Sequence, residues 1–261
     1  MNHCRVAVSA AGLAGVLVCL SGCPSPNSYG TPRTVESGKV AHTVALEAIG
    51  VSYKNPVVAQ NGTVTTESKT VFLPTLPTYQ LRLGVADNVD LGFRVSNLSS
   101  LGADGKFNFL KSKSFDLALD PGFQWMNILG LNLFYFHLPL LAGINFSKSV
   151  SLVLSPGVLY ALAAGTYNNT SSGNSASTGY AAGGFLGRMG VGLNIRFSKG
   201  FAMQPEFTVM HAFNDLASNV FSAGLGFNFG NLPNFDDVGT DDEEAAPAGT
   251  KPAPSAPAKA D

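Results

Sequence analysis

The sequence lacks most of the residue patterns that enzymes and nucleic-acid-binding proteins use. It has only three cysteines and four histidines, and they do not cluster at metal-ligand spacing. A Gly-Lys-Ser/Thr phosphate loop is missing, and so is a basic stripe of the kind that binds nucleic acid. The sequence therefore predicts no metal, no cofactor and no nucleic-acid partner.

An apolar run long enough for a membrane-spanning helix is also missing. The best candidate, Ala7–Val18, is shorter than the ~20 residues that such a helix needs, and it follows the basic residue Arg5. This arrangement predicts a signal peptide over residues 1–22. Leu20-Ser21-Gly22-Cys23 resembles the lipobox of bacterial lipoproteins, and the resemblance implies cleavage before Cys23 and lipidation of Cys23. The alternative is an ordinary signal peptide with an incidental cysteine.

The segment that follows is poor in apolar residues. Residues 23–38 contain three prolines together with several serines and threonines, and we expect a lipidated, flexible tether without core residues. Cys4 and Cys19 would leave with the signal peptide, so the mature chain could not form an internal disulfide.

Apolar and polar residues alternate with a period of two from Lys39 to Phe229, which is the period of a strand with one apolar face. Most of the alternating segments are long enough for a tilted strand that crosses a bilayer, for which ~9–11 residues suffice. We count ten of them: Lys39–Val51, Thr78–Ala86, Val89–Ser96, Leu101–Leu110, Phe115–Trp125, Leu131–Phe146, Val150–Ala161, Tyr180–Phe197, Phe201–Phe213 and Val220–Phe229.

The connections between these segments alternate in length. The short ones are polar hairpin turns at Asp87–Asn88, Lys111–Ser114, Ser147–Ser149 and Ser198–Gly200. The longest, Ser52–Pro77 and Ala163–Gly179, are expected to be loops. This alternation predicts an all-β fold: a single up-and-down antiparallel transmembrane β-barrel of about ten strands over residues 39–230. An even strand number puts both ends of the barrel chain on the short-turn side, in the periplasm.

The last segment carries a recognisable pattern. Phe221–Phe229 alternates without interruption, and Ser222, Gly224, Phe227 and Phe229 resemble the closing-strand motif of bacterial outer-membrane β-barrels. The resemblance implies that this strand closes the barrel and is the assembly signal read by the barrel-assembly machinery, and that outer-membrane lipids surround the protein. The family motif usually ends the chain, whereas here residues 230–261 follow it.

Large aromatic residues lie on the apolar face beside the short turns, where an aromatic girdle would meet the membrane interface. They are Phe109, Phe115, Phe146, Phe197, Phe201 and Phe229. The alternative is a soluble β-sandwich or closed soluble barrel in which these side chains form the core.

The opposite face carries charges of both signs. Five basic residues (Arg82, Arg94, Lys106, Arg188 and Arg196) and six acidic residues (Glu47, Asp90, Asp104, Asp116, Asp120 and Glu206) point inward in this register. Charges enclosed in a narrow barrel must be paired or hydrated. We therefore expect a charge network that fills most of the lumen, with a narrow selective pore as the alternative.

Catalytic residues are not predicted. His42, His137 and His211 fall on different strands, and His137 is interpreted as a hydrogen-bonded interior side chain. A hydrolase at the rim is the third possibility, since His211 lies near Asn214 and Asp215.

The composition changes after the last strand. Residues 231–261 are rich in Pro and Ala and carry seven acidic residues against two basic ones, whereas residues 24–230 carry thirteen basic and ten acidic residues. This predicts a disordered acidic tail that stays solvated or binds a basic periplasmic partner. Taken together, the sequence predicts an integral outer-membrane protein with a structural or surface-binding role, or else a narrow channel for small solutes.

Overall fold

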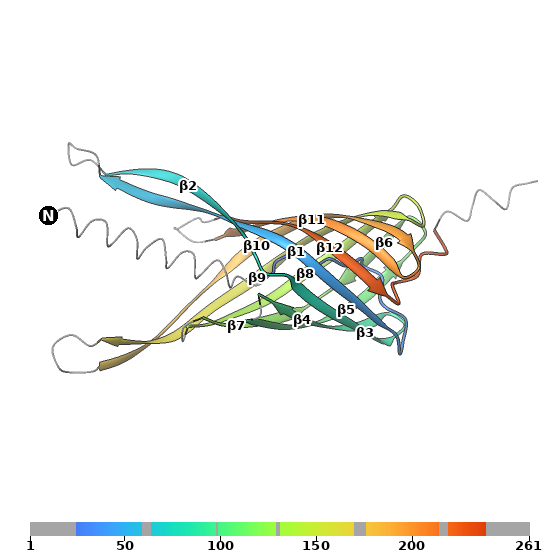
Figure 1. Cartoon of the computed structure of the whole chain (residues 1–261), viewed down its shortest axis with the longest axis horizontal. Coiled ribbons are helices and arrows are strands. Elements are labelled where there is room, and N and C mark those ends of the chain that lie inside the picture. The colour runs from blue at the N-terminus through green and yellow to red at the C-terminus, as the bar shows by residue number, and fades with distance from the viewer. Residues whose placement is uncertain are drawn as a thin grey trace, which may run out of the picture.

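The computed structural model describes residues 25–58, 64–97, 99–128, 131–169, 176–213 and 219–238, which form one closed antiparallel β-barrel (Figure 1). Its strands are β1 (Val40–Val58), β2 (Val64–Pro74), β3 (Thr78–Ala86), β4 (Val89–Ser96), β5 (Ser100–Lys111), β6 (Phe115–Leu119), β7 (Gly122–Ile128), β8 (Leu131–Asn145), β9 (Val150–Asn169), β10 (Ala176–Ser198), β11 (Phe201–Ala212) and β12 (Asn219–Gly230). The described residues contain no helix of the length and apolarity that crossing a bilayer requires.

Two of the strand positions around the barrel are each filled by two shorter strands. β2 and β3 both pair with β1 and are separated only at Thr75–Pro77, and β6 and β7 both pair with β5 and β8 around Asp120-Pro121. Each break contains a proline, Pro77 or Pro121, which has no backbone N–H to give to a ladder. The twelve strands therefore fill ten strand positions around the barrel, which confirms the expected strand number.

The barrel closes between its first and last strands. β1 pairs with β12 from Ala41↔Gly230 to Ser52↔Asn219. β1 begins and β12 ends at the side where the turns at 87–88, 112–114, 147–149 and 199–200 lie, hereafter the short-turn end. The predicted short turns are therefore confirmed.

The two connections expected to be loops are largely strands. β1 and β2 stay paired out to Val58↔Val64, and β9 and β10 stay paired out to Asn169↔Ala176. Both hairpins project beyond the barrel at the opposite side, hereafter the long-hairpin end (Figure 1). β-branched Val and Thr residues are frequent in the β1/β2 arm and favour extended backbone, although the apolar alternation that marks a membrane strand is lost there.

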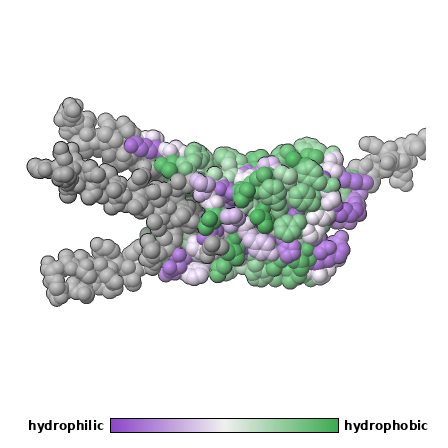
Figure 2. Space-filling model, in the orientation of Figure 1, coloured by the Kyte–Doolittle hydropathy of each residue, from purple (hydrophilic) through white to green (hydrophobic). Residues whose placement is uncertain are grey.

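Side chains divide between the two faces of the barrel as the alternation predicts. Along β4, exposed Leu91, Phe93 and Val95 alternate with buried Asp90 and Arg94. The six girdle phenylalanines are all at least 37% exposed, and Figure 2 shows a largely apolar surface on the visible face of the barrel that gives way to hydrophilic residues at its short-turn end. A soluble sandwich would bury these rings, so that alternative is excluded.

Depth in the membrane sets the cost of a charge on the outer face. Val191 lies mid-strand in β10 and is 42% exposed, whereas Phe197 lies on the same face near the short-turn end. We predict that Val191→Arg lowers the free energy of unfolding by about 2–4 kcal/mol, and that the charge in Phe197→Arg costs only about 0–1 kcal/mol. Refolding titrations in lipid vesicles measure both, and equal losses would contradict the assigned membrane span.

Candidate functional site: a lumen closed by the N-terminal segment

The chain that precedes β1 does not hang free beside the barrel but lies inside it. Residues 25–35, hereafter the plug, are almost all buried, with Tyr29 2% and Val35 1% exposed. The backbone turns into the barrel at Gly38, whose N–H donates to Gly84 O (2.9 Å), and Ser25 lies beside Arg94 and Gln124. The prediction of a flexible tether over residues 23–38 is therefore wrong for residues 25–35. Their polar groups form hydrogen bonds with side chains of the lumen instead of with water. Residues 25–35 lie in the lumen, between β1 and whatever precedes Ser25.

Two strand carboxylates hold the deep half of the plug. Glu206 of β11 accepts the backbone N–H groups of Ser28 (2.7 Å) and Tyr29 (2.8 Å). Glu47 of β1 accepts hydrogen bonds from the Ser25 hydroxyl (2.5 Å), the Asn27 amide (3.1 Å) and the Tyr29 hydroxyl (2.8 Å). Because hydrogen bonds to a buried carboxylate are charge-assisted, each of these contacts is stronger than its neutral equivalent.

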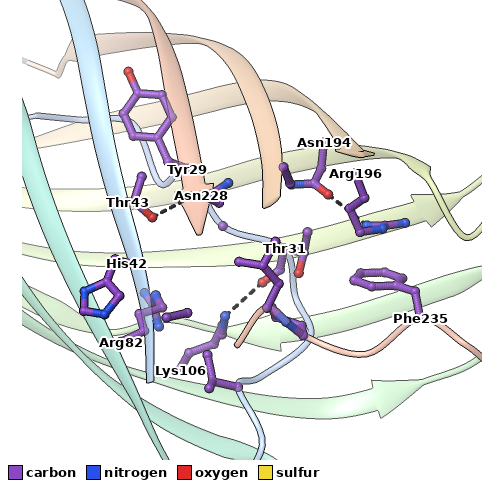
Figure 3. Close-up of a pocket in the computed structure, with 16 residues that line it drawn as sticks. Tyr29, Thr31, His42, Thr43, Arg82, Lys106, Asn194, Arg196, Asn228 and Phe235 are labelled. Atoms are coloured by element: carbon purple, nitrogen blue, oxygen red, sulfur yellow. Dashed lines mark hydrogen bonds between the residues drawn. The ribbon is translucent and has the colours of Figure 1, made fainter. Parts of the chain in front are cut away.

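Basic side chains hold the plug through its carbonyl oxygens. Arg94 Nη1 donates to the carbonyls of Ser25 (3.2 Å) and Asn27 (2.8 Å), and Lys106 Nζ donates to Thr31 O (3.0 Å). Figure 3 shows Lys106 reaching the Thr31 carbonyl across the lumen. These bonds satisfy backbone groups that would otherwise be buried without partners.

The Tyr29 ring passes over two glycines of β12. A Cβ at Gly226 would lie 2.6 Å from Tyr29 Cδ1, and one at Gly224 would collide with the Tyr29 hydroxyl. Gly224 was predicted only as part of the assembly signal. The structure gives this residue a second role, since no larger side chain fits beneath the ring.

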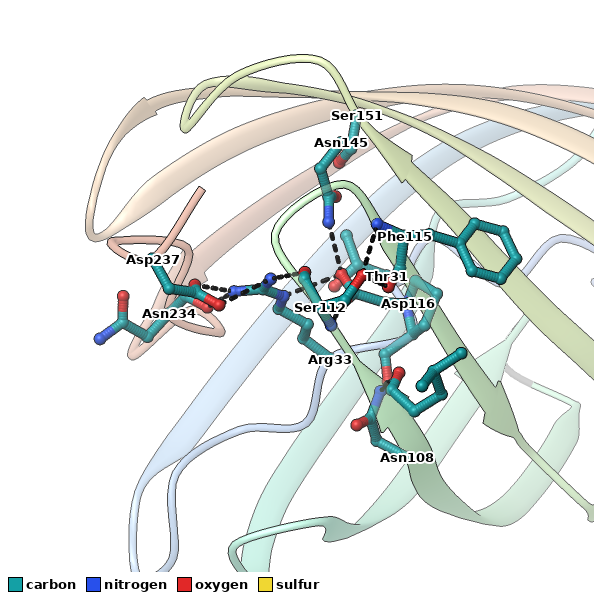
Figure 4. Close-up of polar contacts among 12 residues, drawn as sticks. Thr31, Arg33, Asn108, Ser112, Phe115, Asp116, Asn145, Ser151, Asn234 and Asp237 are labelled. Carbon is teal, nitrogen blue, oxygen red and sulfur yellow. Dashed lines mark hydrogen bonds and ion pairs between the residues drawn. The ribbon is translucent and has the colours of Figure 1, made fainter. Parts of the chain in front are cut away.

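A second set of contacts closes the short-turn end (Figure 4). Arg33 Nε donates to Asp116 (2.8 Å) and Nη2 to Ser112 O (2.8 Å), while Nη1 donates to Asn234 O (2.8 Å) and to Asp237. Residues 231–238, hereafter the clasp, supply these last two partners. The tail expected to be disordered is therefore ordered over the clasp, and residues 239–261 lie outside the described part of the chain.

An aromatic ring packs the clasp against the barrel. Phe235 is 5% exposed, with the Arg196 guanidinium 3.4 Å and the Arg33 guanidinium 4.4 Å from its centroid. Figure 3 shows Phe235 beside Arg196 at the mouth of the lumen. Stacking of this kind adds attraction between a cation and the ring face.

The remaining charges pair with one another along the wall. Arg82 contacts Asp90, Asp104 (2.5 Å) and Asp120 (3.0 Å), and Lys106 Nζ lies 3.2 Å from Asp90. Ten of the eleven residues of the predicted lumen network are buried inside the barrel, and Arg196 is half-buried at its short-turn mouth. Of the network's five basic members, only Arg82 and Lys106 form ion pairs with its acidic members among the described residues. The plug and clasp engage most of the others.

The other predicted site residues fall in several places. Ser222 faces the lumen and accepts a bond from Asn27 (3.0 Å), while Phe229 lies outside and stacks on His42 at 5.3 Å. Phe227 pairs with Val44 where β1 and β12 close the barrel, hereafter the seam. Cys23 lies outside the described residues.

The residues predicted for a rim hydrolase are only partly described. His211 is exposed, and its Nδ1 lies 2.7 Å from Asn219 Oδ1, whereas Asn214 and Asp215 lie outside the described residues. No group of three His, Cys, Asp or Glu in the described residues could hold a metal ion.

A closed antiparallel barrel with an apolar exterior and a polar interior is a transmembrane β-barrel. The sequence model of the outer membrane protein beta-barrel domain matches residues 46–229, so the chain belongs to this family and to the bacterial outer membrane. No curated protein matches the sequence.

Several solved outer-membrane barrels are similar in fold. The translocator domain of the autotransporter NalP from Neisseria meningitidis is 12% identical, with 86% of this chain and 95% of that chain covered and a TM-score of 0.41. Ail, the attachment invasion locus protein of Yersinia pestis, is 11% identical, with 74% and 99% covered and a TM-score of 0.33. The N-terminal barrel of Pseudomonas aeruginosa OprF is 14% identical, with 72% and 97% covered and a TM-score of 0.33.

The bond between Arg33 and Asp237 predicts a pH-dependent clasp. Burial alone would raise the pKa of Asp237, but the hydrogen bonds and charge of Arg33 outweigh it and hold the pKa below its ordinary value. A carboxyl with a lowered pKa stabilises the folded state above the ordinary aspartate pKa of about 4 and loses this effect as the pH falls through the lowered value. The clasp should therefore hold at neutral pH and loosen in acid.

Replacing Asp237 should have the same effect at neutral pH. We predict that Asp237→Asn raises amide hydrogen exchange of residues 31–35 severalfold, because a neutral amide holds Arg33 less strongly. Asp236→Asn is the matched control, since the neighbouring ion pair of Asp236 with Lys199 is exposed and contributes little. Equal exchange in the two variants would show that the clasp does not hold the plug.

Proposed function

We propose that this protein is a sealed outer-membrane barrel whose role is structural or surface-binding and is carried by its projecting hairpins. The observation that supports it is the plug, which occupies the lumen from the short-turn end to the level of Arg94 and Arg188. Two cavities beside it are small, about 40 Å³ near Thr31 and about 160 Å³ near Arg188, and a larger pocket of about 630 Å³ lies at the short-turn end between the clasp and the turns at 147–149 and 199–200. A continuous path for solutes would require the plug to leave.

The hairpin arms suit a binding role. The strand pairs β1/β2 and β9/β10 extend past the barrel as two-stranded ribbons, and the described part of the chain puts no third strand against the arm residues 53–58 of β1. A free strand edge presents unpaired N–H and C=O groups to which another extended chain can add. A partner at the cell surface could dock there by strand addition.

Electrical recording separates the sealed barrel from the narrow channel. We predict that the intact protein is silent in planar bilayers, and that replacing residues 25–35 by a Gly/Ser segment of equal length produces conductance steps. Deletion of residues 239–261 is the control and should leave the protein silent. Heat-modifiable gel migration verifies that each variant is folded. Steady conductance of the intact protein would instead favour the channel.

The direction of the plug bears on the lipid anchor. Residues 38 to 25 run from the short-turn end toward the long-hairpin end, and Cys23 lies at most ~7 Å along the chain from Ser25. Short turns of such barrels face the periplasm. We therefore propose that the chain leaves the lumen toward the cell surface, so that a lipid on Cys23 would lie at the outer leaflet. The acidic tail would stay in the periplasm, where it could meet a basic partner.

An epitope tests this orientation on intact cells. We predict that a tag inserted between Pro24 and Ser25 binds antibody without permeabilisation, whereas the same tag placed after Asp261 binds only after permeabilisation. Mass spectrometry of the mature N-terminus checks lipidation of Cys23. A Pro24–Ser25 tag that needs permeabilisation would mean that the N-terminus stays in the periplasm.

The closing strand remains the proposed signal for the barrel-assembly machinery. Phe229 lies at the end of β12 on the outer face, and Phe227 lies two residues before it on the same face. Their position on the outer face supports this proposal, because a protein that contacts the last strand from the membrane side could reach both rings. The surrounding partner is the lipid of the outer membrane, which the apolar outer face fits.

A further inference from the structure

A cavity of about 160 Å³ lies at the deep end of the plug, between Ser25–Ser28 and the walls of the upper lumen. Its size is close to that of an engineered ~150 Å³ cavity that binds benzene. One wall is apolar and includes Ile49, Leu159 and Met210, which are 0%, 6% and 8% exposed. The cavity can therefore enclose a small ring or branched chain.

The polar wall of the cavity carries an excess of positive charge. Arg94 and Arg188 line it, and within the described ranges no carboxylate lies within ion-pair distance of either guanidinium. The one carboxylate in the lining, Asp120, accepts from Arg82 through both oxygens (3.0 and 3.1 Å). The acidic residue Glu206 accepts hydrogen bonds from the backbone amides of the plug instead of pairing with Arg188.

Arg188 has hydrogen-bonding capacity to spare. Its side chain is 7% exposed, and Nη2 donates to the hydroxyls of Ser28 (3.2 Å) and Ser155 (3.1 Å). Its Nε is buried without a partner. A buried guanidinium N–H without an acceptor is costly, and an anion in the cavity would remove that cost.

We propose that this cavity binds a small monoanionic carboxylate with a compact apolar body, its carboxylate held by Arg188 and Arg94 and its body packed on Leu159 and Met210. Such a ligand matches the cavity in volume, in charge and in the division between a polar and an apolar wall. Binding does not require an open pore, since the cavity lies on the long-hairpin side of the plug.

Ligand-observed fluorine NMR on protein purified from outer membranes tests the proposal. The probes are 4-fluorobenzoate, 4-fluorobenzyl alcohol and 4-fluorobenzylamine, which share the ring and differ in the charge of the substituent. We expect saturable binding of the benzoate and at least about tenfold weaker binding of the other two, because only the carboxylate pairs with the guanidinium. Equal affinity for the alcohol, or no binding of the benzoate, would overturn the proposal.

Variants locate the site. Arg188→Gln should weaken benzoate binding at least about tenfold, whereas Lys199→Gln, which removes the same charge from the exposed short-turn end, should leave it unchanged. Leu159→Phe keeps every charge and fills the cavity, so it should also abolish binding. Heat-modifiable migration identifies the folded fraction of each variant. Binding that survives both Arg188→Gln and Leu159→Phe in folded protein would show that the benzoate binds elsewhere.

Discussion

The structure depends on one electrostatic constraint: charges enclosed in a narrow barrel need partners that a ten-strand wall cannot supply by itself. An uncompensated ion away from water costs several kcal/mol even after relaxation. Arg82 solves this locally by contacting three aspartates. Glu47, Glu206 and Asp116 are instead satisfied by the plug, which brings amides, hydroxyls and Arg33 to them. The plug is thus a structural requirement of the lumen as well as an obstruction.

The barrel itself could be predicted because the pattern that defines a membrane strand is visible in neighbouring residues of the sequence. A strand between lipid and lumen must alternate apolar and polar residues, so strand number, short turns and the outward Phe residues all follow from a period of two. The two hairpin arms were missed for the same reason. Beyond the membrane both faces meet water, the alternation disappears, and the paired strands there, rich in Thr, Ser, Gly and Asn, have the composition of a loop.

The plug was missed because its composition resembles that of a linker. Its residues are mostly Pro, Ser, Asn and Thr, which bond readily to charged walls but show no apolar period. Two signals were nevertheless present in the sequence. The inward charges counted five basic against six acidic, and Arg33 supplies the missing cation. The inner face also had glycines, such as Gly143 and Gly226, at places where Pro32 and Tyr29 now pack.

The position of the plug ties lumen filling to barrel closure. Asn27 donates both to Glu47 on β1 and to Ser222 on β12, so it bridges from inside the seam where the first and last strands meet. Tyr29 packs over Gly224 and Gly226 on one side of this seam and bonds Glu47 on the other. Since the plug is covalently continuous with β1, it is held close to the seam at little entropic cost. The same contacts that fill the lumen therefore stabilise the closed form of the barrel over an open sheet.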